Sequence, residues 1–525
     1  MNKILTRTLL AGLVFASLQA APLQKIDYAL NGDPQTLDPG LNQWFRASIM
    51  LNNLFTGLER MDSSGKPIPG MASAYTLDKS KTVYTFHLAD GAKWSDGQPL
   101  TAQDFEYAWK RVLNPKTASP SSWYLYYLKN GRAANEGKAP LDDVGVQAVD
   151  ARTLKVVLEN PTAYFLDLLC VSAYFPVRRD VVEGPEAWTR NMKTYITNGP
   201  FRMVEAAPKD KYVLQKNPNY LYASNVKLDT LTVHVIEASE AALAAYQTDE
   251  IQVFDDPTIE GVKKYQGTPE LRSFPRAGMC YYDYNTAKKP FDDARVRRAF
   301  SLALNRDQVT RLVLQTNEKP ALGFVPYAIP HGVKRDKEYR DVVGNAFVED
   351  VAAAKKLLAE AGYPNGQGLP KITLICQANQ QAKDVAQAFQ AMWKTNLGAA
   401  VDIRTIESKS YWSELHAGNF NIGQDSWTGD YADPMTNLEI FETNQNVQNN
   451  RWSNAEYDNL IHANHSLADQ KVRMQNFVMC EKILAREMPV LPAYYYSSRL
   501  VCKPNITGVI KTYLGHTSFE HASVQ

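Results

Sequence analysis

A strand–helix–strand pattern in the last third of the chain places the strongest constraint on the fold. Residues 371–375 (KITLI) are rich in β-branched and apolar side chains in the manner of a strand, and residues 401–404 indicate a second strand. Between them, Val385, Phe389 and Trp393 recur at a spacing of four residues, which predicts the apolar face of a helix. We therefore predict a βαβ unit in this stretch.

Strand and helix patterns alternate irregularly over the rest of the chain. Residues 82–88 alternate as a strand does, Thr101 followed by Asp104 is typical of a capping box, and residues 351–361 resemble a helix that Gly362 ends. This alternation predicts an α/β fold with mixed sheets. At 525 residues the chain is long enough for about three domains.

The charge of the chain is close to balanced, with 57 basic and 56 acidic residues. This balance does not favour binding to nucleic acid or to an anionic membrane surface. Aromatic residues make up 11% of the chain, and Tyr and Trp suit a site that is apolar yet hydrogen-bonding. The five cysteines show no CxxC or CxxxC spacing, so buried thiols are expected rather than a metal cluster or a redox pair.

The first residues, 1–20, have the pattern of a secretory signal peptide. Lys3 and Arg7 supply positive charge, residues 9–16 form a short apolar core, and Ala20 is the expected last residue before cleavage. The apolar run is shorter than the roughly 18 residues that a membrane anchor needs. No cysteine stands near the cleavage point to accept a lipid. We therefore expect a soluble, exported, periplasmic protein.

Catalytic signatures are few. An SxxK pattern at 63–66 lies in a turn flanked by Gly and Pro, whereas a nucleophile needs a rigid, partly buried setting with a base. His462 and His465 can share a helix face, but no third metal ligand is positioned with them. We interpret these histidines as solvated surface, and likewise the basic pairs 297–298 and 355–356. The alternative of an exported hydrolase or metal enzyme would rest on the SxxK pattern and the histidine pair alone.

Two aspartates are candidates for a functional acid. Asp38 precedes a proline, a position typical of a turn acceptor. Asp430 follows Trp427 and Gly429, and an acid in an aromatic-walled site favours a cation such as an ammonium. A charge-assisted hydrogen bond of that kind contributes about 1.5–3 kcal/mol. The pattern alone leaves Asp430 open to two interpretations, a ligand-binding acid and a structural turn.

A series of short motifs runs through the chain in a characteristic order. They are TLDP at 36–39, LFTGL at 54–58, PGMA at 69–72, YTFHL at 84–88, AKWSDG at 92–97, TAQDF at 101–105, TNGPF at 197–201, KPF at 289–291, VR at 296–297 and AYYY at 493–496. Together they resemble the periplasmic oligopeptide- and murein-peptide-binding proteins of ABC importers, which form extracellular solute-binding protein family 5. The resemblance extends over nearly the whole chain after residue 20.

The resemblance implies a two-lobed α/β periplasmic binding protein fold, type II-like and of cluster C, with a hinge and an extra inserted domain. By matching, the first lobe combines residues 21–56, 177–279 and 497–525, the extra domain is 57–176, and the second lobe is 280–496. The two strands that cross between the lobes would act as hinges during closure over a ligand.

The resemblance also predicts which residues meet the ligand. In peptide binders of this kind an acid in a Trp-x-x-Asp-Tyr segment holds the ligand's α-ammonium, and that acid matches Asp430. The backbone before it would run beside the peptide as a strand, and Phe45 would offer similar backbone contacts from the opposite lobe. The other predicted ligand-binding residues are Gln43, Tyr124, Lys288, Gln424, Ser426, Trp427, Thr428, Gly429 and Tyr496.

The part of the site that would receive the ligand's carboxylate departs from the family pattern. Basic residues of the oligopeptide binders are matched here by Gln424, Leu415 and Ala382, and an acid of the first lobe by Gln43. Of these basic residues, only the lysine ahead of the Pro-Phe pair has a basic counterpart here, which is Lys288. Either the carboxylate is met by water and Lys288, or the ligand is longer, modified or restricted in length.

Further expectations follow from the resemblance. Cys280 matches a family disulfide cysteine whose partner position is Thr428, so that bridge should be absent. No catalytic residue, metal or cofactor is expected. The expected partners are a peptide ligand and an inner-membrane ABC permease, without nucleic acid, and the protein would be a monomer serving peptide transport. The alternatives are the same scaffold specialised for a murein peptide or another amine-bearing ligand, an exported enzyme, and a holdase-like chaperone.

Overall fold

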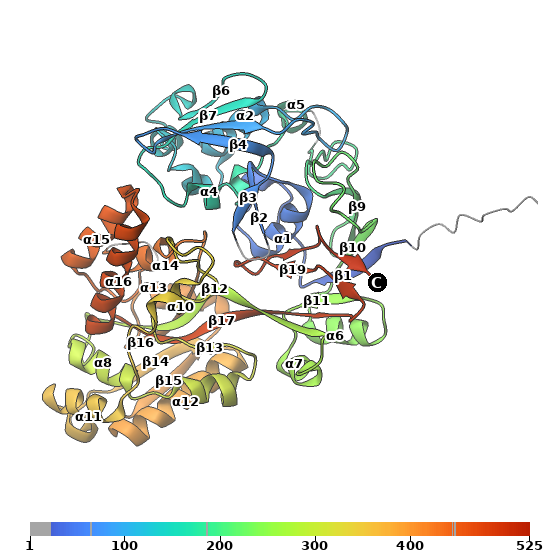
Figure 1. Ribbon diagram of the computed structural model, residues 1–525. Coiled ribbons are helices and arrows are strands. Elements are labelled where there is room, and N and C mark those ends of the chain that lie inside the picture. Colours follow the sequence, from blue (N-terminus) through green and yellow to red (C-terminus); the bar gives the residue numbers. More distant parts are fainter. Residues whose placement is uncertain (1–22, 63–65, 185–186, 444, 446–447) are drawn as a thin grey trace, which may run out of the picture.

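The computed structural model describes residues 23–62, 66–184, 187–443, 445 and 448–525. The predicted signal peptide lies outside these residues, as does most of the SxxK pattern. Figure 1 shows the 57–176 region above one side of the molecule and the helices that follow β12 below it, with long strands running between the two sides of the molecule. Within the described residues, no helix combines the length and the hydropathy needed to span a bilayer.

The main sheet is mixed and carries strands from both ends of the chain. In order across the sheet, its strands are β15 (Val401–Ile406), β14 (Ile372–Gln377), β16 (Ile422–Thr428), β12 (Leu271–Tyr284), β17 (Val490–Cys502), β11 (Val253–Asp255), β1 (Lys25–Leu30), β10 (Thr230–Val235), β9 (Lys211–Lys216) and β8 (Phe201–Ala207). The short strand β13 (Lys319–Pro320) pairs with β17 beside this path. The mixed α/β fold predicted from the sequence is confirmed.

Two long antiparallel strands, β12 and β17, connect the two sides of the molecule (Figure 1). One end of β12 pairs with β16, and the opposite end of β17 pairs with β11. Their ladder is interrupted between Pro275 and Met279, where the register shifts. In that interval Ala277 donates its backbone N–H to Tyr513 at 2.8 Å. A bulge of this kind bends a strand and changes the direction of its side chains, and here it lies beside the candidate cleft.

Smaller sheets flank the main one. The 57–176 region holds the sheet β4 (Ala72–Leu77), β5 (Val83–Leu88), β7 (Thr153–Val157) and β6 (Val146–Ala148), and the hairpin β2 (Glu59–Met61) with β3 (Pro67–Pro69). The C-terminal segment forms the pairs β18 (Ile506–Thr507) with β21 (Ser523–Val524), and β19 (Ile510–Lys511) with β20 (Thr517–Ser518).

Helices cover the sheets. They are α1 (Phe45–Leu54), α2 (Ala102–Leu113), α3 (Gly131–Asn135), α4 (Phe165–Leu168), α5 (Arg179–Val182), α6 (Ser239–Gln247), α7 (Ile259–Tyr265), α8 (Ala294–Leu302), α9 (Arg306–Gln308), α10 (Tyr339–Val343), α11 (Val351–Glu360), α12 (Gln380–Leu397), α13 (Ser408–His416), α14 (Met435–Leu438), α15 (Ala455–Ser466) and α16 (Gln470–Glu487).

The predicted βαβ unit is confirmed. Strands β14 and β15 are parallel neighbours, and α12 connects them with Val385, Phe389 and Trp393 fully buried. Trp393 also donates its indole N–H to the carbonyl of Phe300 at 2.8 Å, which satisfies the polar atom of a buried ring. The predicted capping box is present at the start of α2.

The interpretation of the basic pair at 297–298 as solvated surface is wrong for Arg297. Its side chain is only 4% exposed and donates to the backbone carbonyls of Glu487 at 2.9 Å and Phe291 at 2.8 Å. The last carbonyls of α16 lack partners within their own helix, so a buried guanidinium satisfies them. The pair at 355–356 is exposed, as expected.

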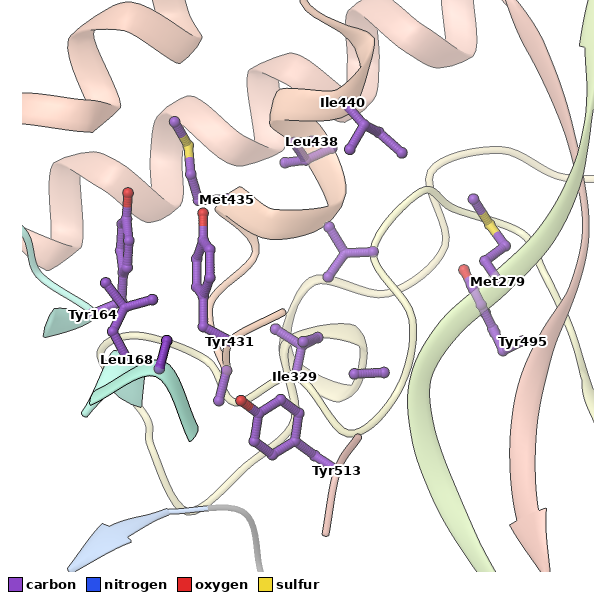
Figure 2. Packing of buried hydrophobic residues seen from close by; sticks show 14 of the residues in the cluster. Tyr164, Leu168, Met279, Ile329, Tyr431, Met435, Leu438, Ile440, Tyr495 and Tyr513 are labelled. Atoms are coloured by element: carbon purple, nitrogen blue, oxygen red, sulfur yellow. The ribbon is translucent and has the colours of Figure 1, made fainter. Parts of the chain in front are cut away.

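The hydrophobic core continues from the 57–176 region into the helices that follow β16. Figure 2 shows Tyr164 and Leu168 beside Tyr431 and Met435. The Tyr164 and Tyr431 rings are stacked, with their centroids 4.4 Å apart. This contact packs the 57–176 region against the segment that follows β16.

Candidate ligand-binding cleft

A cavity of about 260 Å³ lies where three distant parts of the chain meet. The start of α1 forms one wall, the 57–176 region a second, and the residues that end and follow β16 a third. The predicted site residues that line it are Gln43, Phe45, Tyr124, Thr428, Gly429 and Asp430. A larger groove of 790 Å³ along α2 contains none of the predicted site residues.

The Asp430 side chain is a partly exposed carboxylate in the wall of this cavity. One of its oxygens accepts a hydrogen bond from the Tyr124 hydroxyl at 2.9 Å, and its backbone N–H donates to Thr436 Oγ1 at 2.9 Å. Burial, partly offset by the Tyr124 hydrogen bond, raises the pKa of Asp430 to about 6. No lysine, arginine or histidine of the described chain lies within ion-pair distance of this carboxylate. It is therefore a largely desolvated acid that remains available to a cation.

Strand β16 presents a free backbone edge beside this acid. It pairs with β12 along its whole length but with β14 only at Ile422 and Gly423. Gly429 donates its N–H to Ala277 on the β12 side at 2.7 Å. Because backbone groups alternate between the two edges of a strand, those of Thr428 point away from β12. Beyond Gly423 no described strand pairs with that edge, so this part of it can accept an extended peptide as an added strand.

Gly278 lies opposite the end of β16, and its lack of a side chain leaves room for two predicted site residues, Tyr496 and Thr428. A Cβ atom there would lie 2.7 Å from the Tyr496 ring and 2.9 Å from Thr428 Oγ1. The register also corrects the expected counterpart of Thr428. Gly278 faces Thr428 across the strands, whereas Cys280 faces Ser426. All five cysteines are free thiols, and Cys280 is buried.

The side chains of Trp427, Ser426 and Tyr496 lie around this cavity but do not line it. Trp427 is half-buried against the core, and its indole N–H is buried with no hydrogen-bond partner among the described residues. Tyr496 lies in β17 and lines a neighbouring cavity of 290 Å³ together with Lys319 and Tyr327.

Gln424 and Lys288 lie away from the Asp430 cavity. Gln424 uses its side-chain oxygen to accept the backbone N–H of Gln377 at 3.1 Å. Lys288 follows the opposite end of β12 and donates its ammonium to the carbonyl of Gly418 at 2.6 Å. The two other positions at which the family pattern has a basic residue, Leu415 and Ala382, are buried. These four positions therefore offer no unpaired positive charge near Asp430.

The remaining sequence candidates have structural roles. Asp38 accepts the backbone N–H of Gly40 at 2.9 Å, as a turn acceptor does, and also pairs with Arg111. His462 and His465 each pair with a glutamate. No cluster of three or more His, Cys, Asp or Glu side chains suited to a metal occurs in the described part of the chain.

Arg276 and His516 are the titratable basic residues among the cavity residues that the sequence analysis missed. Arg276 lies in the interrupted part of β12, and the flanking Pro275 and Gly278 were the available signal, since both residues mark irregular strands. His516 lies in a C-terminal loop that carries no recognisable motif. Burial, together with the charges of Arg276 and Lys511, lowers the pKa of His516 to about 3, so the ring is neutral.

The fold and the cleft define a two-lobed solute-binding protein. A profile of the bacterial extracellular solute-binding proteins, family 5 (middle region), matches residues 66–449. The chain belongs to this family, whose members are binding proteins.

Curated relatives match nearly the whole chain. The oligopeptide-binding protein OppA of Bacillus subtilis is 35% identical over 500 residues, which cover 93% of this chain and 91% of the relative. The periplasmic murein peptide-binding protein MppA of Escherichia coli is 33% identical over 492 residues, which cover 93% and 90%.

Solved structures agree with this assignment. The unliganded open form of the murein tripeptide-binding protein MppA superposes with a TM-score of 0.83 at 32% identity, covering 96% of this chain and 98% of that chain. Haemophilus influenzae OppA in complex with RPPGFSPFR superposes with a TM-score of 0.75 at 27% identity, covering 96% and 100%.

Proposed function

We propose that this protein is the periplasmic peptide-binding component of an ABC importer. It captures a peptide between a first lobe (21–56, 177–279 and 497–525) and a second lobe (280–496), with 57–176 as the extra domain, and delivers it to an inner-membrane permease. Oligopeptide- and murein-peptide-binding relatives that match over nine-tenths of the chain support this function. The long strands β12 and β17 support the hinge between the lobes.

One observation carries the proposal. The Asp430 carboxylate lacks a counter-ion among the described residues, and it directly follows a strand with a free edge. An extended peptide on that edge would place its first residue beside Asp430. The α-ammonium would then complete an ion pair in a desolvated site, and main-chain hydrogen bonds would hold the rest of the peptide whatever its side chains.

Calorimetry with paired peptides tests this function. The purified protein, freed of any bound ligand, is titrated with tetra-alanine and with N-acetyl tetra-alanine. We expect acetylation to weaken binding at least about tenfold, or about 1.4 kcal/mol, because it removes the ammonium. Asp430→Asn should weaken binding of the free peptide similarly and respond little to acetylation. Equal affinities for both peptides in the wild-type protein would refute the ammonium site.

A second candidate keeps the scaffold and changes the ligand to a murein peptide or another amine-bearing compound. The uncharged residues Gln424, Leu415 and Ala382 favour it, because they leave an ordinary peptide carboxylate without the basic partners of the oligopeptide binders. Competition between murein tripeptide and a mixture of ordinary peptides distinguishes the two. Tight binding of the mixture with no preference for the tripeptide would exclude this candidate.

The proposed role is binding without turnover, by a monomer. A peptide incubated with the protein, with and without added divalent metals, should remain intact by mass spectrometry. Cleavage of the peptide would support the enzyme alternative instead. Sedimentation at micromolar concentration should give the mass of one chain.

A further inference from the structure

Arg276 is a half-buried cation with a buried Nε, placed by the bulge of β12 in the wall of the Asp430 cavity. The strand register breaks between Pro275 and Met279, the interval that contains Arg276, and the neighbouring Ala277 bonds to Tyr513 instead of continuing the ladder with β17. Because a bulge redirects side chains, Arg276 lies beside the cleft rather than in regular strand packing.

The guanidinium of Arg276 is held by aromatic rings and not by an acid. Its central carbon lies 5.1 Å from the centroid of the Phe45 ring and 5.8 Å from that of Tyr496. Its Nε is buried and has no hydrogen-bond partner, and no carboxylate of the described chain is within ion-pair distance. Asp256 acts on it only through a longer-range electrostatic attraction.

This arrangement leaves a hydrogen-bonding capacity unused. The buried Nε–H of this charged group carries a desolvation penalty because it has no partner, and a bound anion would relieve it. The planar guanidinium offers its donors in a fork that matches a carboxylate. The aromatic rings orient the group without neutralising it. Arg276 is therefore built to receive an anion from the cleft.

The charges of the cavity indicate what kind of molecule that anion belongs to. Among the described residues that line it, Arg276 and Asp430 are the two charged side chains, since His516 is neutral. They do not pair with each other, so each is free for the ligand. Both lie on one cavity of about 260 Å³, so a ligand that satisfies both must carry an amine and a carboxylate a short distance apart.

We propose that Arg276 binds a carboxylate close to the ligand's amino terminus and so selects acidic amino-terminal segments. This inference rests on the proposed function, because it takes Asp430 as the site of the ammonium. The carboxylate belongs to the side chain of the first or second residue. The C-terminal carboxylate of a dipeptide has the same chemistry and is a separate arm of the test.

The experiment compares matched peptides by calorimetry on the full protein. The pairs are Glu-Ala-Ala-Ala with Gln-Ala-Ala-Ala, and Ala-Glu-Ala-Ala with Ala-Gln-Ala-Ala. A third pair, Ala-Ala with its C-terminal amide, tests whether Arg276 binds the C-terminal carboxylate of a dipeptide instead. We expect the wild-type protein to bind the acidic member of at least one tetrapeptide pair about tenfold or more tightly. Arg276→Gln should abolish that preference, and Arg276→Lys should retain part of it.

Lys319→Gln is the matched control, because Lys319 is a basic residue of the neighbouring cavity, 3.8 Å from the centroid of the Tyr327 ring. It should leave the acidic preference unchanged. Thermal unfolding of each variant shows that the fold is kept. The proposal is overturned if the wild-type protein has no acidic preference in either tetrapeptide pair. A preference that survives Arg276→Gln, or that Lys319→Gln removes, also overturns it, as does a preference confined to the dipeptide.

Failure of the ammonium site gives a different result. If acetylation of the amino terminus leaves affinity unchanged while the acidic preference depends on Arg276, the carboxylate site stands and the role of Asp430 falls. If acetylation weakens binding but the Glu and Gln peptides bind equally, the ammonium site stands and the role of Arg276 falls. If no peptide binds, both fall together.

Discussion

Peptide affinity should fall as the pH is lowered from 7 to 5, because Asp430, the proposed acceptor of the ligand's ammonium, titrates in this range. Burial raises the pKa of Asp430 to about 6 in the ligand-free protein. About nine-tenths of the molecules therefore carry the negative charge at pH 7 and about one-tenth at pH 5. The peptide's α-ammonium, with a pKa of about 7.7–8.0, stays charged throughout. The expected loss is about tenfold in affinity, or about 1.4 kcal/mol.

The same carboxylate destabilises the ligand-free fold above pH 6. An unfolded aspartate has a pKa of about 3.9, so the folded protein binds the proton more tightly. Its stabilising contribution is complete below about pH 4 and is lost as the pH rises to about 6. A rise of about two units in the pKa of Asp430 corresponds to at most about 3 kcal/mol in the free energy of unfolding. Because the side chain is partly exposed to the cleft, we expect a value of about 1–3 kcal/mol. Asp430→Asn should therefore be more stable than the wild type at pH 7, and the two should converge near pH 4.

Calorimetry with tetra-alanine at pH 5, 6, 7 and 8 measures the affinity, and urea unfolding of the ligand-free protein measures the stability. Asp402→Asn is the control, since Asp402 is an exposed acid paired with Lys371 outside the cleft. The control should show the wild-type pH profile in both assays. A wild-type affinity that is flat between pH 5 and 7, or an Asp430→Asn variant that keeps the wild-type profile, would refute the reasoning.

Three further changes test neighbouring features of the cleft. Tyr124→Phe removes the hydroxyl that donates to Asp430, so the midpoint of the affinity–pH profile should move upward, as calorimetry across the same pH range would show. Gly278→Val would place a side chain against Tyr496 and Thr428, so it should lower stability by about 1–3 kcal/mol in urea unfolding and weaken peptide binding. N-methylating the backbone of tetra-alanine at its second amide should weaken binding several-fold by calorimetry, because an added strand then loses one main-chain hydrogen bond; unchanged affinity would speak against strand addition at β16.

Local patterns predicted much of the fold because they depend on neighbours in sequence. The βαβ unit, the capping box at Thr101 and the helix that ends before Gly362 all follow from periodicity and terminal residues. Arg297 could not be predicted in this way. A basic residue on a helix is normally solvated, and only the packing of α8 against the end of α16 buries it.

The site shows the same limit. The motif around Asp430 predicted an acid near aromatic residues, but its partner Tyr124 lies 306 residues away in sequence. Arg276 carries no motif, and its position depends on a strand bulge that forms only when β12 pairs with β17. Gln424 and Lys288 matched the family pattern by position, yet their side chains bond to nearby backbone. Sequence matching locates such residues without showing whether their hydrogen bonds are already used.

Native mass spectrometry of the protein purified from cells, with identification of whatever it carries, tests the central claim most directly. We predict that the bound compounds have a free primary amine, shown by reductive dimethylation after release, and that Asp430→Asn protein from the same cells carries far less of them. Short peptides rich in acidic residues near the amino terminus would agree with both charged residues of the cleft. Bound compounds without an amine, or equal loading of the variant, would contradict the account.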